Sequence, residues 1–271
     1  MAAAQRQAVN TIIQGTAAVS GGDLIIGAAK ELVFIGPGNV TAGSVVQNNA
    51  SGASALTIAD SGTVTLTGAN SYSGGTTVAA GMLLVAGSLG GTAVTVGEGA
   101  TLGGTGSIGG TVVVLGGSTA GTQGAINLAD GMIGTLMFSD PSAADTVLTL
   151  GGLTVGSPSA FTFEVGAVAD RIQVTAGKVA VNPGGSLINI TALSGFGPGT
   201  YDLLDFPTNQ ASGLGYLSLA TTSLNGYALS LRSTRTSEQL VVAVPEPSAL
   251  ALLGAGALGL LAYARRRRRA A

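Results

Sequence analysis

Carboxylates are the only plausible catalytic side chains in this sequence. Its 271 residues include no histidine and no cysteine, which removes the usual general base, the thiolate nucleophile and the commonest zinc ligands. Asp202 and Asp205 are three residues apart, and two carboxylates held a few ångströms apart can hydrolyse a glycosidic bond. The segment around them, YDLLDFP, is instead typical of a strand and a turn with solvent-facing aspartates. We therefore expect no catalytic residue.

A nucleotide cofactor or a metal ion is not expected either. Residues 104–109 read GTGSIG and fit the dinucleotide pattern G-x-G-x-x-G, which should open a helix. The next residues, GTVVV, are typical of a strand, and in a chain with 45 glycines such a match arises by chance. No EF-hand spacing or calcium-binding nonapeptide repeat is present.

The C-terminal tail has the most specific pattern in the chain. Pro245, Glu246 and Pro247 disfavour helix and predict an extended, readable segment. Residues 248–264 are uncharged and predict a single transmembrane helix of roughly 25 Å. Five basic residues follow and predict a stop-transfer cluster that stays in the cytoplasm: Arg265, Arg266, Arg267, Arg268 and Arg269.

This order of motif, apolar segment and arginines over residues 244–269 resembles the PEP-CTERM sorting signal of Gram-negative bacteria. The resemblance implies an exosortase, a membrane transpeptidase-like protease, as the partner that processes the chain near Pro-Glu-Pro. It also implies transient residence in the inner membrane, followed by the cell envelope, the outer surface or the extracellular matrix. The alternative is a simple single-span anchor whose prolines only end the preceding domain.

The body must be built from short strands. Residues 62–114 contain alternating runs such as TVTLT, AVTV and TVVV, separated by glycines at intervals of about eight to ten residues. This spacing predicts a right-handed parallel β-solenoid, in which each coil is buried only by its neighbours. Glycine would supply positive φ at the corners, and Asn70 would adopt left-handed geometry or stack in a ladder. A β-sandwich is the alternative, but few aromatic residues are available for its core.

Residues 62–110 resemble the autotransporter-associated β-strand repeat of bacterial passenger domains. The phrase LTGANSYSGGT, residues 66–76, carries most of the resemblance, and GATLGGTG, residues 99–106, continues it. Later segments, DRIQV at 170–174 and GTYDLL at 199–204, are similar to further passenger coils. The chain departs from the autotransporter pattern because no translocating barrel follows the passenger, and the sorting tail takes its place.

Charge excludes one class of partner. The formal net charge is −2, but the five clustered arginines hide an acidic body, since residues 1–244 hold six basic and twelve acidic side chains. A mildly acidic surface with few charges has no basic patch that could bind phosphates, so nucleic acid is not expected as a partner. Residues 1–22 also lack the apolar core of a signal peptide, which predicts a start upstream of Met1 if the protein is exported.

The sequence thus predicts an all-β protein: a right-handed parallel β-solenoid (β-helix) body with a single C-terminal transmembrane α-helix. Its expected regions are a β-rich segment at 1–61, the repeat at 62–110, further coils at 111–243 and the sorting signal at 244–271. The expected function is that of a non-enzymatic structural or adhesin-like surface protein associated with exopolysaccharide or biofilm matrix. The alternatives are a β-helical carbohydrate-active enzyme and, without export, a membrane-tethered cytoplasmic scaffold.

Overall fold

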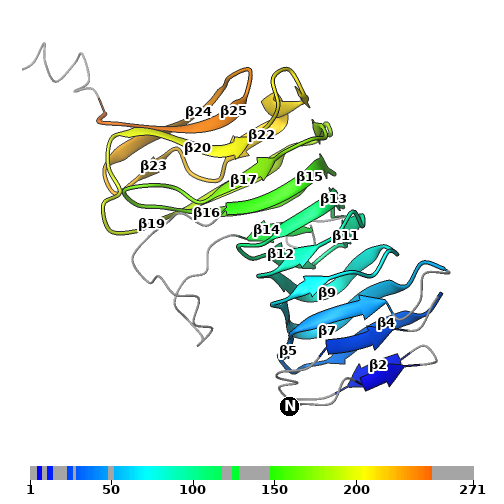
Figure 1. Cartoon of the computed structure of the whole chain (residues 1–271). Coiled ribbons are helices and arrows are strands. Elements are labelled where there is room, and N and C mark those ends of the chain that lie inside the picture. Colours follow the sequence, from blue (N-terminus) through cyan, green and yellow to red (C-terminus); the bar gives the residue numbers. More distant parts are fainter. Residues whose placement is uncertain are drawn as a thin grey trace, which may run out of the picture.

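The computed structural model describes residues 5–7, 11–14, 23–26, 29–47, 52–117, 124–127 and 147–245. These residues form strands throughout, with one 3-10 turn, η1 (Leu214–Tyr216), between them. Parallel strands are stacked coil upon coil, so the body is elongated, from β2 (Thr11–Gln14) at one end to β25 (Ser237–Ala243) at the other (Figure 1). The all-β part of the prediction is confirmed, while the handedness of the coil stays a prediction.

Each complete coil crosses three faces, here called A, B and C, and the chain runs through them in the order C, A, B. Long strands bend at a corner and contribute to two faces. β7 (Ala55–Leu66), for example, pairs with one strand through its first residues and with another through its last.

The strands of face A are β2, β4 (Glu31–Gly36), the first parts of β7 and β9 (Thr76–Val85), β11 (Val94–Val96), the second parts of β13 (Ser107–Val114) and β15 (Val147–Val155), β18 (Val179–Val181) and β21 (Ala211–Ser212). Face B consists of β5 (Val40–Ala42), the second parts of β7 and β9, β12 (Thr101–Gly103), β14 (Ala125–Asn127), β16 (Ala160–Val165), β19 (Ser186–Ala192) and β22 (Leu217–Leu219). Face C begins with β1 (Gln5–Gln7), β3 (Asp23–Ile26) and β6 (Ser44–Gln47) and continues with β8 (Ala69–Asn70), β10 (Ser88–Leu89), the first parts of β13 and β15, β17 (Arg171–Val174) and β20 (Gly199–Asp205).

The core is a column of apolar side chains that runs along the axis of the coil. Side chains alternate between the two sides of a strand, so every second residue points inward. Val94 on β11 lies in register with Thr76 below it and Val112 above it, which makes a coil of 18 residues here. Val94 and Val112 are completely buried. Each such side chain contributes about 1.5–3 kcal/mol when it is removed from water, but only if the neighbouring coil is present to cover it.

Corners are made by residues that let two coils approach closely. Gly104 has a φ of +114°, and a Cβ placed there would lie 2.2 Å from the carbonyl oxygen of Val85 in the coil below. This confirms the expected use of glycine at corners. Asn70 differs from its prediction, because it lies in β8, and its side-chain amide donates to the carbonyls of Gly68 and Ser88, at 2.8 and 2.9 Å. Its neighbour in register on β10 is Leu89, so an asparagine ladder does not continue in that direction.

The parallel pattern ends in an antiparallel cap, defined as β23 (Ser223–Leu224), β24 (Tyr227–Ser233) and β25. β25 is antiparallel to β20 of face C, β24 is antiparallel to β25, and β23 is antiparallel to β24. Asn225 and Gly226 join β23 to β24 with φ angles of 51° and 83°, the left-handed pair typical of a tight hairpin. The cap therefore closes the last coil, where a further parallel coil would otherwise have to stack.

The predicted fold class is wrong in its second part. The described residues contain no helix that is long and apolar enough to cross a membrane, so the structure does not support a body followed by a single transmembrane helix. The physical reason is that apolar residues up to Val242 recur at every second position and are buried by strand stacking, whereas a spanning helix needs about 20 consecutive ones. The segment expected to form that helix, 248–264, lies outside the described residues.

Candidate functional site

The two aspartates singled out from the sequence lie on the outer side of β20. A register shift against β25 falls between Asp202 and Leu204, which adds one residue to β20. Because of this bulge, Leu203 and Leu204 are both buried, and the two aspartates both point outward although they are three positions apart, a spacing that would place them on opposite sides of a regular strand. Asp202 is exposed and Asp205 is half-buried.

Both carboxylates have partners on neighbouring strands. Arg171 of β17 places its Nη1 3.5 Å from Oδ2 of Asp205, and Gln239 of β25 donates from Nε2 to Oδ1 of Asp202 at 2.7 Å. Arg232 of β24 in turn donates from Nε and Nη2 to Oε1 of Gln239, at 2.9 and 2.6 Å. Burial raises the pKa of Asp205, the charge of Asp202 raises it further, and Arg171 opposes both effects. The result is a row of cross-strand pairs on an outer face.

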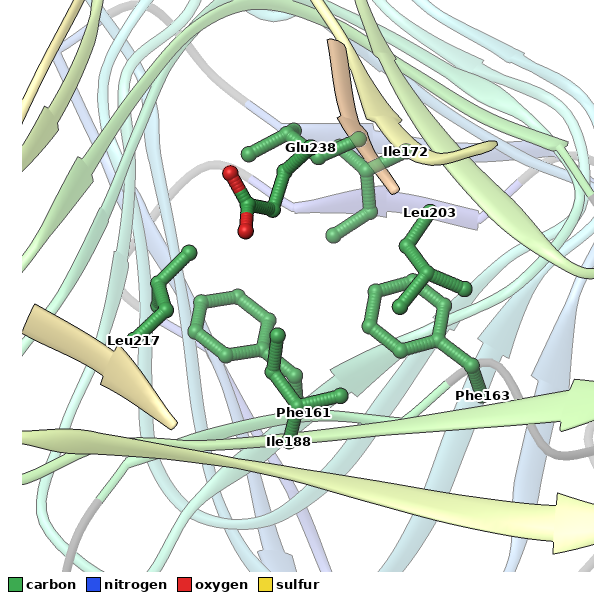
Figure 2. A pocket seen from close by; sticks show the side chains of 8 residues that line it. Phe161, Phe163, Ile172, Ile188, Leu203, Leu217 and Glu238 are labelled. Carbon is green, nitrogen blue, oxygen red and sulfur yellow. The ribbon is translucent and has the colours of Figure 1, made fainter. Parts of the chain in front are cut away.

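A third carboxylate, that of Glu238, is buried beneath this row. Glu238 is on β25 opposite Leu204, and its side chain is 2% exposed. Figure 2 shows its carboxylate at the edge of a small cavity between apolar side chains from β16, β17, β19, β20 and β22. The volume is about 10 Å³, which is close to the least that one water molecule needs and far too small for a sugar ring. Besides Glu238, the lining residues are Phe161, Phe163, Ile172, Ile188, Leu203, Leu204 and Leu217.

The carboxylate of Glu238 accepts a hydrogen bond from a hydroxyl of the cap itself. Ser233, at the end of β24, donates from Oγ to Oε2 of Glu238 at 2.5 Å. Burial raises the pKa of Glu238, and the hydrogen bond from Ser233 opposes part of this increase. The sequence does contain a signal for this residue, because Glu238 is in phase with Leu240 and Val242, both of which are buried. The sequence-based interpretation missed it.

The chain leaves the body directly from the capping strand. β25 is paired on both sides, with β20 and β24, as far as Val242. Val244 is 66% exposed, and Pro245 is exposed beside it. The described chain thus passes from a fully paired strand into exposed residues outside any strand within two residues. Of the predicted sorting residues, Pro245 lies at this exit, whereas Glu246, Pro247 and the arginines at 265–269 lie outside the described residues.

Comparison with protein families gives two matches, one at this exit and one in the body. Residues 243–269 match the model of the PEP-CTERM protein-sorting motif. Residues 56–85 match the passenger-associated-transport-repeat, and they correspond to β7, β8 and β9, about one and a half coils of the solenoid. Both resemblances expected from the sequence are thereby confirmed, the second over a range that begins earlier and ends earlier. A comparison with curated proteins found none that matches the chain.

Together these findings define a class of protein. The sorting motif and the passenger repeat support an exported surface protein whose body is a β-solenoid. The PEP-CTERM motif implies processing by an exosortase-type membrane enzyme. It also implies passage through the membrane on the way to the cell envelope or surface.

Proposed function

We propose that this chain is a non-enzymatic structural or adhesive protein of the cell surface, which associates with exopolysaccharide in the surrounding matrix. The single observation that carries the proposal is the exit at Val244 and Pro245, where the last strand of the solenoid is followed directly by the sorting motif. A solenoid with stacked, repeating faces suits repetitive contact better than chemistry at one centre.

Face A supplies a surface of the kind that such contact needs. Thr57, Thr77 and Thr95 lie in register on three consecutive strands and face outward. Adjacent strands are about 4.7–4.9 Å apart, so the hydroxyls form a regular column. At one end of it, the hydroxyl of Thr57 donates to the carboxylate of Glu31 on β4. Small residues lie two positions before each threonine: Ala55 in β7, and Gly75 and Ala93 immediately before β9 and β11. An uncharged polymer with many hydroxyls can donate and accept hydrogen bonds along such a column.

The outer carboxylates support the non-enzymatic interpretation. Asp202 and Asp205 are held by Gln239 and Arg171 on an outer face, and the small cavity nearby has no room for a sugar. The raised pKa of Asp205 is the one observation that favours the alternative, a carbohydrate-active enzyme with Asp205 as general acid.

The sorting step is tested in the native host with the three motif residues changed together to alanine at Pro245, Glu246 and Pro247. We expect the variant to keep its full mass and to remain in the membrane fraction, because loss of both prolines removes the extended segment that a processing enzyme reads. Mass spectrometry of membrane and surface fractions measures both. Val244→Ala is the matched control, which should be processed like the wild type. Normal release of the triple variant would contradict the proposal.

The matrix role is tested by sedimentation of the protein with exopolysaccharide from the same host. We expect Thr77→Arg to reduce co-sedimentation several-fold, because a long charged side chain interrupts the centre of the hydroxyl column. Asp202→Asn combined with Asp205→Asn should sediment like the wild type and leave the polysaccharide chain length unchanged. If the wild type shortens the polysaccharide and the double variant does not, the enzymatic alternative replaces our proposal.

A further inference from the structure

Glu238 sits where a carboxylate has no structural advantage over an apolar side chain. It belongs to the capping strand, it is 2% exposed, and the seven other residues around its cavity are apolar (Figure 2). A hydrocarbon side chain of similar size would fill this space without the cost of burying a polar group. A buried acid at such a position makes the stability of the surrounding element depend on its protonation.

The charged groups near Glu238 are engaged on the outer surface of the same elements. On β20, Asp202 and Asp205 face outward, and Arg171 of β17 pairs with Asp205. On β24, Arg232 donates to Gln239. On the β16 side, Glu164 and Asp170 are two further buried carboxylates, and Asp170 accepts the backbone N–H of Glu164. None of the described residues that line the cavity is a cation, so an ionised Glu238 has only the Ser233 hydroxyl to stabilise it.

We propose that Glu238 is a proton-operated latch on the cap: the protonated side chain seals β25 onto the last coil, and ionisation draws water into the cavity and releases β25. The geometry behind this is the position of the carboxylate between β25 and the apolar residues of β20 and β22. An uncompensated charge there is unfavourable, and the cap can remove that unfavourable contribution by opening locally.

Release of β25 would expose the residues that precede the sorting motif. Leu240 and Val242 are buried, and β25 is paired on both edges, so a protease that binds extended chain reaches only the residues after Ala243 while the cap is closed. Opening would extend the accessible segment by the length of β25. This link to sorting rests on the function proposed above, whereas the latch itself does not.

The direction of the pH effect follows from the raised pKa of Glu238. Well below the ordinary glutamate pKa of ~4.3, the side chain is protonated in the open and the closed cap and has no influence on the equilibrium. Above that value, the open cap ionises more readily than the closed one. Opening then becomes more favourable, by up to about tenfold per pH unit, until the pH passes the raised pKa of the closed cap. The latch is therefore tight in acid and loose at neutral pH.

Hydrogen exchange of the full-length chain, followed by mass spectrometry and corrected for intrinsic exchange rates, tests the latch. Wild type and Glu238→Gln are compared from about pH 4 to pH 8, which spans the ordinary glutamate pKa. We expect equal protection of β24 and β25 in acid and, near neutrality, several-fold slower exchange in Glu238→Gln. The exposed Glu98→Gln serves as the matched control and should follow the wild type.

Ser233→Ala provides a second, independent variant. It removes the hydroxyl that stabilises the ionised form in the closed cap, so the rise in exchange should begin at the same pH as in the wild type but continue to higher pH and reach a higher level. If Glu238→Gln and the wild type show the same pH dependence in β25, the latch is refuted. Since the exchange experiment involves no sorting enzyme, this result would leave the proposed function untouched. Conversely, a working latch in a protein that is processed equally well with and without Glu238→Gln would break only the link to sorting.

Discussion

Single residues decide where this chain can turn and where it cannot. Gly104 combines a positive φ with a backbone contact that leaves no room for a Cβ. Gly91 is also in a turn, but it has an ordinary φ and open space around the same position. Substitution of the two glycines therefore tests whether a corner needs glycine only where φ is positive and a neighbouring backbone is close, or at every turn position.

We expect Gly104→Ala to destabilise the body by about 1–3 kcal/mol or more, because the substitution imposes left-handed backbone on alanine and pushes its Cβ into Val85. Gly91→Ala should change stability by less than about 1 kcal/mol, since alanine restricts the unfolded chain without a clash. Urea unfolding followed by circular dichroism measures both. Equal midpoints for the two variants would show that the Gly104 corner rearranges freely.

The alternation in the sequence agrees with the observed core, whereas the buried carboxylate of Glu238 was not predicted. Alternation in AVTV and TVVV places Val94 and Val112 correctly in the core. The predicted solvent-facing position of Asp202 and Asp205 is confirmed, but the bulge in β20 that produces it was not predicted, because bulges are set by the partner strand, which the local sequence does not contain. Glu238 was missed because a charged residue is expected at the surface, although its position, two and four residues before the buried Leu240 and Val242, places it on the inward side of β25.

Among the elements, the cap differs most from expectation. The prediction continued the solenoid to residue 243, whereas the last three strands are antiparallel. The dipeptide Asn225-Gly226 is a strong hairpin signal that could have shown this change. The pairing of β25 with β20 could not have been predicted in the same way, because it joins segments about thirty residues apart with no local marker.

The cap can be loosened without touching its carboxylate. Leu240 on β25 is completely buried, so Leu240→Ala should cost about 2–5 kcal/mol of cap stability through lost burial and a cavity. Amide exchange in β20, β24 and β25 should accelerate, while exchange in β11 should not change, since coils in a solenoid contact only their neighbours. Val241→Ala, at the adjacent outward position, is the control. Faster exchange in β11 would mean that the body unfolds as one cooperative unit.

The whole molecule is a one-dimensional stack with a closed end, and that end carries the exit to the sorting motif. Its two family matches fit this plan, because the passenger repeat lies within the stack and the sorting motif begins at the last residue of β25. The division of labour along the axis was predictable from sequence, since each motif is local. We propose that the faces of the coil contact exopolysaccharide, and that the capped end is where the sorting enzyme processes the chain.

The 18-residue coil around β11 has a consequence for how such proteins change over generations. An in-frame duplication of one coil would insert a strand into each face and lengthen the rod by one strand spacing, about 4.7–4.9 Å, while both flanking surfaces find the same complementary neighbour as before. Neither the cap nor the exit would need to adapt. The length of the rod can therefore evolve by gain or loss of whole coils, independently of the sorting signal.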